Sequence, residues 1–270
     1  MSPTIDVASL LYLWTERTLY IGPLFDQYTR TPAASSLVIG MEGPLRIRDV
    51  ASADFVETRS VLIPAGVTIE VLSGDQVITC CYLDPLGRDL WALQTLMQRQ
   101  VGRLWCDSAQ EAHQIQQLHT IYQQRLPAAH AYRLLLQEIF PPASTYATAP
   151  PVRSQIAEVV EMIRRDPVSN PSNFQLALKV GMSETQLQRQ FKQATGIPIR
   201  RYRLWHRLFV TATLVMLGKT LTDAALDAGF SDSSHFNRAF RSMLGMTPSF
   251  VFQRRDKIFI FAGGDDPSLS

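Results

Sequence analysis

The sequence predicts an α+β protein made of a small β-sandwich or barrel with added helices and a separate all-α part. Short segments rich in β-branched residues, broken by Gly- and Pro-containing turns, predict the β part over residues 1–140. The stretch Pro141–Pro151 holds four prolines, which predicts a stiff linker with no regular element. A helical pattern that occurs twice predicts two helix-turn-helix units within residues 152–257, before a tail over 258–270.

The β part is expected to consist of short strands followed by helices. The strand-like segments are SSLVIGM (35–41), LRIRDV (45–50), DFVETRSVLI (54–63), TIEVL (68–72) and QVITCCYL (76–83). From about Asp89 the apolar spacing becomes helical, with two apolar faces: Leu90, Leu93, Leu96 and Met97, then Ile115, Leu118, Tyr122 and Leu126. A further helical piece covers Leu134–Ile139. The second of these helices is rich in Gln, and it can pack on the barrel or pair with its copy in a second subunit.

Composition and charge indicate a protein that stays in the cytoplasm and binds a polyanion through its C-terminal part. Residues 152–257 carry 16 Lys and Arg against 8 Asp and Glu, whereas residues 1–151 carry 10 against 14. A basic half beside an acidic half suggests that only the basic half contacts nucleic acid. No apolar run is long enough to cross a membrane, and the N-terminus lacks a signal-peptide pattern. Cys80, Cys81 and Cys106 are expected to be reduced packing residues, with the adjacent pair on opposite faces of a strand.

The all-α part is expected to be helical throughout. The predicted helices are 152–165, 173–180, 183–194, 199–217, one beginning at Thr220, 232–244 and a short one after Pro248. Ser172 with Gln175, and Thr220 with Asp223, have the spacing of reciprocal N-terminal caps. The run KIFIF (257–261) is apolar and is expected to pack back on one of the two parts.

The repeat carries the chemistry of a DNA reader. Leu187, Arg189, Phe191 and Gly196 recur at the same spacing as Phe236, Arg238, Phe240 and Gly245. The apolar members face inward, so the outer faces hold Thr185, Gln186, Gln188, Arg189 and Lys192 in one helix, and Ser233, Ser234, His235, Asn237, Arg238 and Arg241 in the other. Arginine matches the O6 and N7 atoms of guanine, and Gln or Asn matches the N6 and N7 atoms of adenine.

Sharp turns and helix starts complete each unit. Gly181 and Gly229 let the backbone turn between the two helices. Ser183 and the Ser231–Asp232 pair are expected to cap the reading helices, whose free N–H groups can hold phosphates. The connecting helix of about 18 residues spans ~27 Å, which allows a separation near the ~34 Å of one DNA turn. Arg200, Arg201, Arg203 and Arg207 at its start are expected to serve phosphates, the alternative being internal ion pairs with Glu184 or Asp223.

Residues 152–255 resemble the DNA-binding domain of the AraC/XylS family of bacterial transcription regulators. The match lies in AALDAGFSDSSHFNRAFRSMLGMTP (224–248) and in MSETQLQRQFKQATGIPIRRYR (182–203). The resemblance implies seven helices, binding to double-stranded promoter DNA, and RNA polymerase as a partner. Carried over by motif position, the base readers are Thr185, Gln188, Arg189, Ser233, Ser234, His235, Asn237 and Arg238. Phosphate contacts are expected from Ser183, Lys192, Arg200, Arg201, Ser231 and Arg241. Ala224, Val251 and Phe252 depart from the family pattern, which affects local packing.

Family members commonly carry an N-terminal cupin-like domain with added helices, and residues 35–140 resemble that arrangement. No His precedes His113, and His113 and His119 lack the spacing of a ligand pair, so neither a metal nor another cofactor is expected. Trp14, Trp91 and Trp105 can line an effector pocket or belong to the core. Dimerisation and small-molecule sensing are both open roles for this part, and a homodimer is expected.

Two other classes of protein compete with a transcription regulator. An enzyme would need convergent acid, base, nucleophile or metal groups within residues 1–140, and none occurs at a suitable spacing. An architectural DNA binder would favour a higher density of Lys and Arg over ordered Gln, Asn and Arg readers. The sequence therefore predicts a sequence-specific regulator. The family resemblance suggests an activator, whereas the residues themselves specify neither the target promoter nor the direction of regulation.

Overall fold

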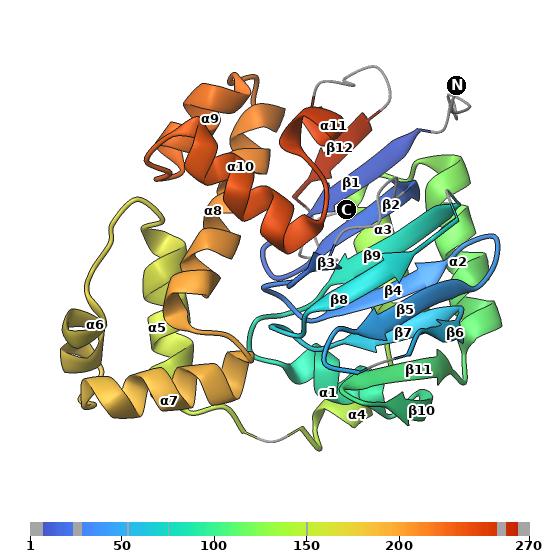
Figure 1. Ribbon diagram of the computed structural model, residues 1–270, viewed down its shortest axis with the longest axis horizontal. Helices are drawn as coiled ribbons and strands as arrows, with labels where there is room; N and C mark the ends of the chain where they lie inside the picture. Colours follow the sequence, from blue (N-terminus) through green and yellow to red (C-terminus); the bar gives the residue numbers. More distant parts are fainter. Residues whose placement is uncertain are drawn as a thin grey trace.

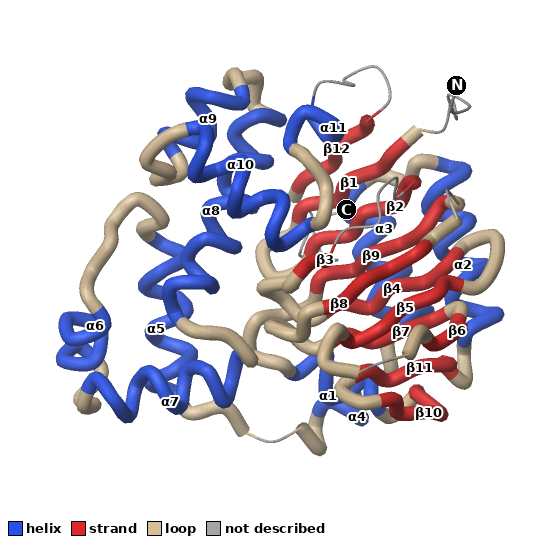
Figure 2. The backbone as a smooth tube through the Cα atoms, in the orientation of Figure 1, coloured by secondary structure: helices blue, strands red, loops and turns tan. Residues whose placement is uncertain are grey.

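The computed structural model describes residues 8–23, 29–52, 54–74, 76–149, 151–252 and 258–263. A β-rich part and a helical part lie side by side, joined by the segment that follows α4 (Figure 1). Figure 2 shows the separation of strands from the C-terminal helices, which confirms the predicted α+β class. Residues 1–7 of the predicted β part, Lys257 of the apolar run and residues 264–270 of the tail lie outside the described residues.

The β-rich part contains two sheets. The larger has the strand order β10-β11-β7-β4-β9-β2-β1-β12, and the smaller has the order β3-β8-β5-β6. The strands are β1 Ser9–Leu13, β2 Thr18–Pro23, β3 Thr29–Arg30, β4 Ser36–Gly40, β5 Leu45–Asp49, β6 Val56–Thr58, β7 Ser60–Ile63, β8 Ile69–Leu72, β9 Val77–Tyr82, β10 Met97–Val101, β11 Leu104–Ser108 and β12 Ile258–Ala262. All pairs are antiparallel except β12 on β1. Every predicted strand segment contains a strand.

The central strands of the larger sheet are buried on both faces. Leu37 and Ile39 of β4 pack with the helices behind the sheet, whereas Val38 between them packs in the other core. Cys80 and Cys81 divide in the same way, so the prediction that they point to opposite faces is confirmed. Both thiols are buried and free, and burial raises their pKa, which keeps them in the neutral thiol form.

Helices cover the outer face of the larger sheet. They are α1 Arg88–Gln94, α2 Glu111–Gln124, α3 Ala128–Leu134 and the π-helical turn η1 Leu135–Ile139. Helix α2 packs on the sheet through Ile115, Leu118 and Ile121. Of the two alternatives for this Gln-rich helix, packing on the β part and pairing with a second subunit, the structure shows the first. The expected helical face that included Leu96 and Met97 is wrong. The chain leaves α1 after Gln94 and forms the hairpin β10–β11, whose turn places Gly102 at a φ of +57°.

The Pro-rich stretch contains a short helix, α4 Ala143–Tyr146, so the expectation of no regular element there is wrong. Its prolines flank this turn of helix and do not interrupt it, and Pro142 immediately precedes its first residue. The Tyr146 hydroxyl reaches back to the buried carboxylate of Asp89 at 3.1 Å. This contact ties the stretch to the β-rich part.

The C-terminal part consists of seven helices over residues 151–252. They are α5 Ser154–Arg165, α6 Asn173–Lys179, α7 Glu184–Thr195, α8 Ile199–Met216, α9 Leu221–Asp227, α10 Ser233–Leu244 and α11 Pro248–Phe252. Each lies within about two residues of its predicted bounds. The predicted reciprocal cap is complete at Ser172, which accepts from the N–H of Gln175 while the Gln175 side chain accepts from the N–H of Ser172. Thr220 accepts from the N–H of Asp223, but the Asp223 carboxylate accepts from the Thr220 hydroxyl and not from its backbone. No helix among the described residues is long and apolar enough to cross a membrane.

The two parts are held together at several places. Strand β12 pairs in parallel with β1, so the apolar run after the last helix returns to the β-rich part, where the Phe261 ring stacks on Tyr12 with centroids 4.7 Å apart. The backbone N–H of Thr31 donates to the carbonyl of Ser242 at 2.9 Å. The ring of Trp205 on α8 lies against Tyr82 of β9, with centroids 4.8 Å apart. The helical part is therefore fixed to the sheet.

Candidate nucleic-acid interface

Two helix-turn-helix units are present, α6–α7 and α9–α10, with α8 between them (Figure 1). In each unit a glycine adopts a left-handed backbone between the helices, Gly181 at a φ of +66° and Gly229 at +92°. An L side chain rarely adopts such angles, which explains the glycine at both turns. At Gly229 space is also limiting, because an added Cβ would lie 3.0 Å from Nε of Arg207.

The two reading helices, α7 and α10, begin with different caps. The Ser183 side chain accepts a hydrogen bond from the N–H of Gln186, whose side chain accepts from the N–H of Ser183, so the capping box is complete. Asp232 caps α10 by accepting from the N–H of His235 at 2.7 Å. Ser231 is not itself the cap, because its hydroxyl donates to the Asp232 carboxylate at 2.9 Å.

The cap of α10 has an electrostatic consequence. The hydrogen bond from the His235 N–H, with the one from Ser231, lowers the pKa of Asp232. The carboxylate is therefore ionised at neutral pH, and an ionised group repels a phosphate. Ser183 is neutral, so the start of α7 is better suited to a DNA phosphate than the start of α10.

Both reading helices bury one face and expose the other. In α7 the buried side chains are Leu187, Phe191 and Thr195, and in α10 they are Phe236, Ala239, Phe240 and Met243. The exposed predicted readers are Thr185, Gln188, Arg189, Ser233, Ser234, Asn237 and Arg238, and the exposed predicted phosphate contacts on these helices are Lys192 and Arg241. Gln188 forms an internal hydrogen bond to Glu184 at 2.9 Å, which DNA would have to replace or accommodate.

His235 differs from the other predicted readers because it is half-buried. Its ring lies edge-on to Phe230 at 5.4 Å between centroids, and its Nδ1 lies 3.1 Å from the Ser231 hydroxyl. These contacts fix the start of α10 against the preceding turn. The structure therefore gives His235 a packing role that the repeat alone did not indicate.

The arginines at the start of α8 do not act as one group, as the sequence suggested. Arg201 donates to the carbonyl of Thr31 in the β-rich part, Arg203 to Asn170 and to the carbonyl of Pro171, and Arg207 to the carbonyl of Pro167. None of them pairs with Glu184 or Asp223. Of the four, Arg200 alone is exposed. In this arrangement Arg201, which was expected to bind a phosphate, contacts the β-rich part, because that part lies against the start of α8.

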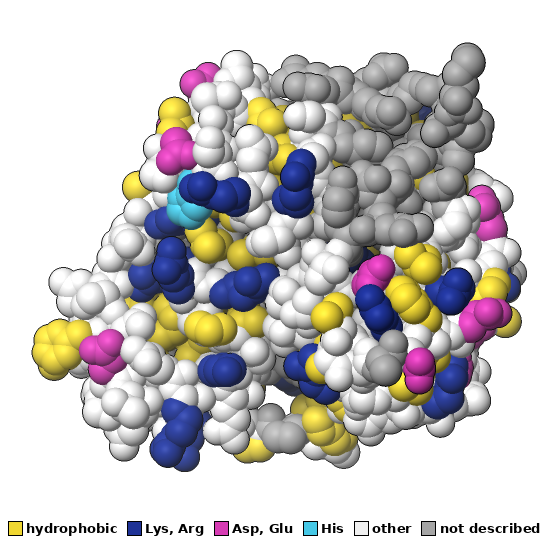
Figure 3. All heavy atoms as spheres, in the orientation of Figure 1, with side chains coloured by type: hydrophobic (Ala, Val, Ile, Leu, Met, Phe, Trp, Pro, Cys, Tyr) yellow, Lys and Arg dark blue, Asp and Glu magenta, His cyan; other side chains and the backbone are white. Residues whose placement is uncertain are grey.

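Lys and Arg side chains gather on the visible face of the helical part, with few acidic groups among them (Figure 3). This placement agrees with the excess of basic residues in 152–257. The positive potential of such a face attracts a polyanion over a range of about one Debye length, near 8 Å at physiological salt. The helical part therefore combines a positive surface with exposed polar readers.

The other expected groups of the β-rich part have structural partners. Trp14 is fully buried and donates to the carbonyl of Ala128 at 3.2 Å, whereas Trp105 lies in β11. Trp91 lines a cleft beside α1 and α7. His113 is paired with Glu138 at 2.9 Å. Among the residues that the structure describes, no three His, Cys, Asp or Glu side chains lie close enough to hold a metal ion.

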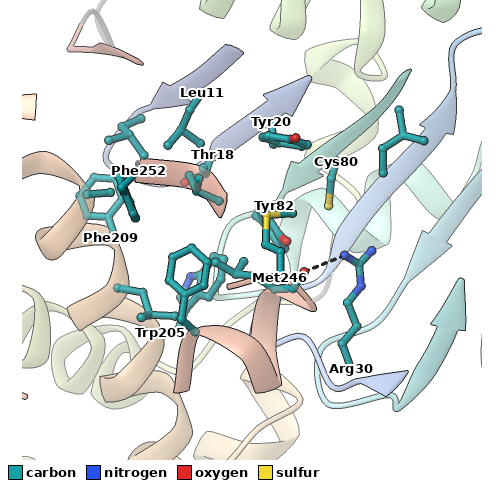
Figure 4. Close-up of a pocket in the computed structure, with 17 residues that line it drawn as sticks. Leu11, Thr18, Tyr20, Arg30, Cys80, Tyr82, Trp205, Phe209, Met246 and Phe252 are labelled. Atoms are coloured by element: carbon teal, nitrogen blue, oxygen red, sulfur yellow. Dashed lines mark hydrogen bonds between the residues drawn. The ribbon is translucent and has the colours of Figure 1, made fainter. Parts of the chain in front are cut away.

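A cavity that the sequence did not indicate lies between the larger sheet and helices α8, α10 and α11 (Figure 4). Its walls come from segments far apart in the chain, so no local pattern could reveal it. Trp205 and Phe209 of α8, two large apolar residues that remain only partly buried, line it.

Comparison with known proteins agrees with this geometry. Residues 176–254 match the family model of a helix-turn-helix domain. The chain is 35% identical over 85 residues to the transcriptional activator RhaS of Klebsiella pneumoniae, a match that covers 31% of each chain. It is 26% identical over 160 residues to the Msm operon regulatory protein of Streptococcus mutans, covering 54% of this chain and 58% of that one. The match to RhaS thus spans about a third of that relative's length.

The fold as a whole is similar to that of ToxT from Vibrio cholerae. The structures superpose with a TM-score of 0.57 over 87% of this chain and 97% of ToxT, at 12% identity. At that identity the likeness concerns the fold alone. It extends across both the β-rich and the helical part, so this pairing of parts occurs in a solved structure.

Proposed function

We propose that the chain is an AraC-family, sequence-specific DNA-binding regulator of bacterial transcription. The proposal is supported by the match of residues 176–254 to the family model of a helix-turn-helix domain and by the likeness to the activator RhaS. In this proposal residues 152–257 bind promoter DNA and residues 1–140 dimerise, sense a small molecule, or both. The stretch 141–151 joins them, and the predicted tail 258–270 begins with β12, which pairs with β1 of the larger sheet. The protein acts in the cytoplasm, with RNA polymerase as its partner, and no catalytic step is part of its action.

The observation that carries the proposal is the pair of exposed reading helices joined by α8. Helix α8 has 18 residues, so it spans ~27 Å at about 1.5 Å per residue. With its flanking turns this length suits two helices in successive major grooves, ~34 Å apart on one face of the DNA. We expect base contacts from Thr185, Gln188, Arg189, Ser233, Ser234, Asn237 and Arg238, with His235 orienting α10. Phosphate contacts are expected from Ser183, Lys192, Arg200 and Arg241.

Two features of similar proteins extend the proposal. RhaS is named a transcriptional activator, which favours activation over repression for this chain. ToxT has been solved with an unsaturated fatty acid and with (E)-4-(8-methylnaphthalen-1-yl)but-3-enoic acid bound. Both ligands are carboxylic acids, and a regulator of the same fold can be governed by an effector of comparable chemistry.

The test is a comparison of DNA affinities across salt concentration. Full-length protein is titrated by fluorescence anisotropy against a site selected from genomic DNA and against random duplex, at several concentrations of KCl. A specific regulator retains a preference of at least ~10³ for the selected site. Equal affinity for both duplexes would contradict the proposal and favour an architectural DNA binder. Sedimentation of the same sample tests the dimer.

A further inference from the structure

Each helix-turn-helix unit carries an exposed leucine at the same position of its first helix. Leu178 of α6 lies three residues before Gly181, and Leu226 of α9 lies three residues before Gly229. Leu178 is 71% exposed and Leu226 is 47% exposed, whereas the two residues before each leucine are buried. Leaving a leucine side chain in water forgoes the free energy of its burial. The same unfavourable exposure therefore occurs in both units.

A second exposed apolar side chain accompanies each leucine. Phe174 lies one helical turn before Leu178 in α6 and is 61% exposed. Leu217, in the turn between α8 and α9, is 70% exposed, and the ion pair from Lys219 to Asp227 holds this turn beside the residue that follows Leu226. Neighbouring exposed apolar side chains are typical of sites where another macromolecule binds. We call Phe174, Leu178 and Lys179 the α6 surface, and Leu217, Asp223, Leu226 and Asp227 the α9 surface.

The two surfaces carry opposite charge. Lys179 follows the leucine of α6, whereas Asp227 follows the leucine of α9 at the equivalent position. Lys179 is the only charged residue of α6, and it forms no ion pair within the described part of the chain. Helix α9 holds Asp223 and Asp227 and no basic residue, and Lys219 pairs with one of these two acids. Two like surfaces would therefore repel each other, whereas an α6 surface attracts an α9 surface.

The two surfaces lie too far apart to meet within one chain. Helices α6 and α9 are at opposite ends of the helical part, with α8 between them (Figure 1). An α6 surface can therefore pair with an α9 surface only in a second copy of the chain. Such a head-to-tail contact uses unlike patches, so it leaves one patch free at each end and can continue along a row of copies.

We propose that the α6 surface of one chain docks on the α9 surface of a second copy bound to the adjacent site on the same DNA. This proposal rests on the proposed function, and its interface differs from the dimer expected through residues 1–140. Only a few side chains take part, so the contact is weak between free molecules. Adjacent DNA sites hold the two copies at an effective concentration in the millimolar range, at which a weak contact forms. The result is cooperative binding to sites in tandem.

Gel-shift titration of the full-length protein tests the proposal on duplexes that hold one selected site or two copies of it in tandem at several spacings. We expect the first copy to raise the affinity for the second at least about tenfold at one spacing. Inserting about five base pairs, half of the ~10.5 in one DNA turn, should abolish this gain because it rotates the second copy to the opposite face. No cooperativity at any spacing would overturn the proposal. Affinity for the one-site duplex tests the proposed function separately.

Variants of the two surfaces locate the contact. Leu178→Ser and Leu226→Ser should each remove the cooperativity and leave the one-site Kd unchanged, because both side chains are exposed. Lys179→Glu or Asp227→Lys alone should also remove it, since each places like charges opposite one another. The double variant should restore it, because the two surfaces are then again of opposite charge. Val50→Ser changes an exposed apolar residue of the β-rich part and is the matched control with unchanged cooperativity.

Three outcomes would overturn the proposal. Cooperativity that persists in both leucine variants would assign it to residues 1–140. Failure of the double charge variant to restore cooperativity would show that α6 does not face α9 of the second copy. Unchanged cooperativity in the leucine variants, together with weaker retention of RNA polymerase on a promoter with one site, would assign the two surfaces to the polymerase.

Discussion

Replacing Arg189 or Arg238 by alanine should weaken DNA binding without destabilising the protein. Both side chains are exposed at equivalent positions of α7 and α10, and neither donates a hydrogen bond within the described part of the chain. Removal therefore leaves no internal group unpaired, and the free energy of unfolding should change by no more than about 0.5 kcal/mol. A lost bidentate contact to guanine costs about 1–3 kcal/mol, or about 5- to 150-fold in Kd.

The assay is fluorescence anisotropy on the selected site and on a set of single base-pair changes. Arg189→Ala should relax the base preference in one half-site and Arg238→Ala in the other. The two residues share no partner, so the double variant should lose the sum of the two free energies to within about 0.5 kcal/mol. The slope of log K against log salt should stay as in the parent protein, because base contacts release no counterions.

A uniform loss of affinity on every sequence, with a smaller salt slope, would refute this reasoning. That result would show that both arginines bind phosphates. Thermal denaturation of each variant is the control, since a fall in Tm would attribute the loss of binding to misfolding.

Three further predictions concern α8, the second turn and the buried acid of the β-rich part. Arg200→Ala should reduce the salt slope of DNA binding by about 0.9 without changing Tm, whereas Arg203→Ala should lower Tm and leave that slope unchanged, because its guanidinium holds the loop before α6. Gly229→Ala should destabilise the protein by at least about 1–2 kcal/mol in urea denaturation, since its φ of +92° is strained for alanine; a neutral effect would contradict this account of the turn. Burial and the neighbouring Asp89 carboxylate raise the pKa of Asp84 to about 6. The folded state therefore binds this proton more tightly than the unfolded state does, and the free energy of unfolding should fall by up to about 3 kcal/mol as the pH rises from 4 to 6. Asp84→Asn should remove that part of the pH dependence, and an unchanged profile would show that Asp84 is not its source.

The helices of the C-terminal part were predictable because each is specified locally. Ser172, Ser183 and Thr220 cap their helices through contacts within three residues, and Gly196 and Gly245 end α7 and α10 with a left-handed backbone. The buried faces repeat at helical spacing. Propensity, capping and periodicity agree, so the pattern leaves little choice of structure.

Strands β1 and β2 were not predicted, although β4 and β9, which are also buried on both faces, were. Strand β1 contains no β-branched residue, whereas β4 and β9 do. Strands β1 and β2 are apolar on both sides and show no alternation, so they carry no period-2 signal. The hairpin β10–β11 follows α1 so closely that Leu96 and Met97 matched the helical face by coincidence. Strand β12 depends on pairing with β1 across almost the whole chain, which no local pattern specifies.

In the candidate site, too, the features set by local sequence were predictable and those set by tertiary contacts were not. Which residues α7 and α10 expose follows from helical period, and the outer faces were predicted with the exception of half-buried His235. The roles of Arg201, Arg203 and Arg207 depend on the loop before α6 and on the β-rich part, which pack against α8 only in the folded chain. The position of Arg30 beside the end of α10 likewise depends on the tertiary structure.

The central claim is that one chain reads two successive major grooves through α7 and α10. The most direct measurement is to incubate purified full-length protein with sheared genomic DNA from its host and to sequence the fragments that it retains. The account predicts a recurring site with two short motifs about one DNA turn apart. A substitution in one reading helix should change one of these motifs and leave the other unchanged. Retention of fragments that share no motif would contradict it.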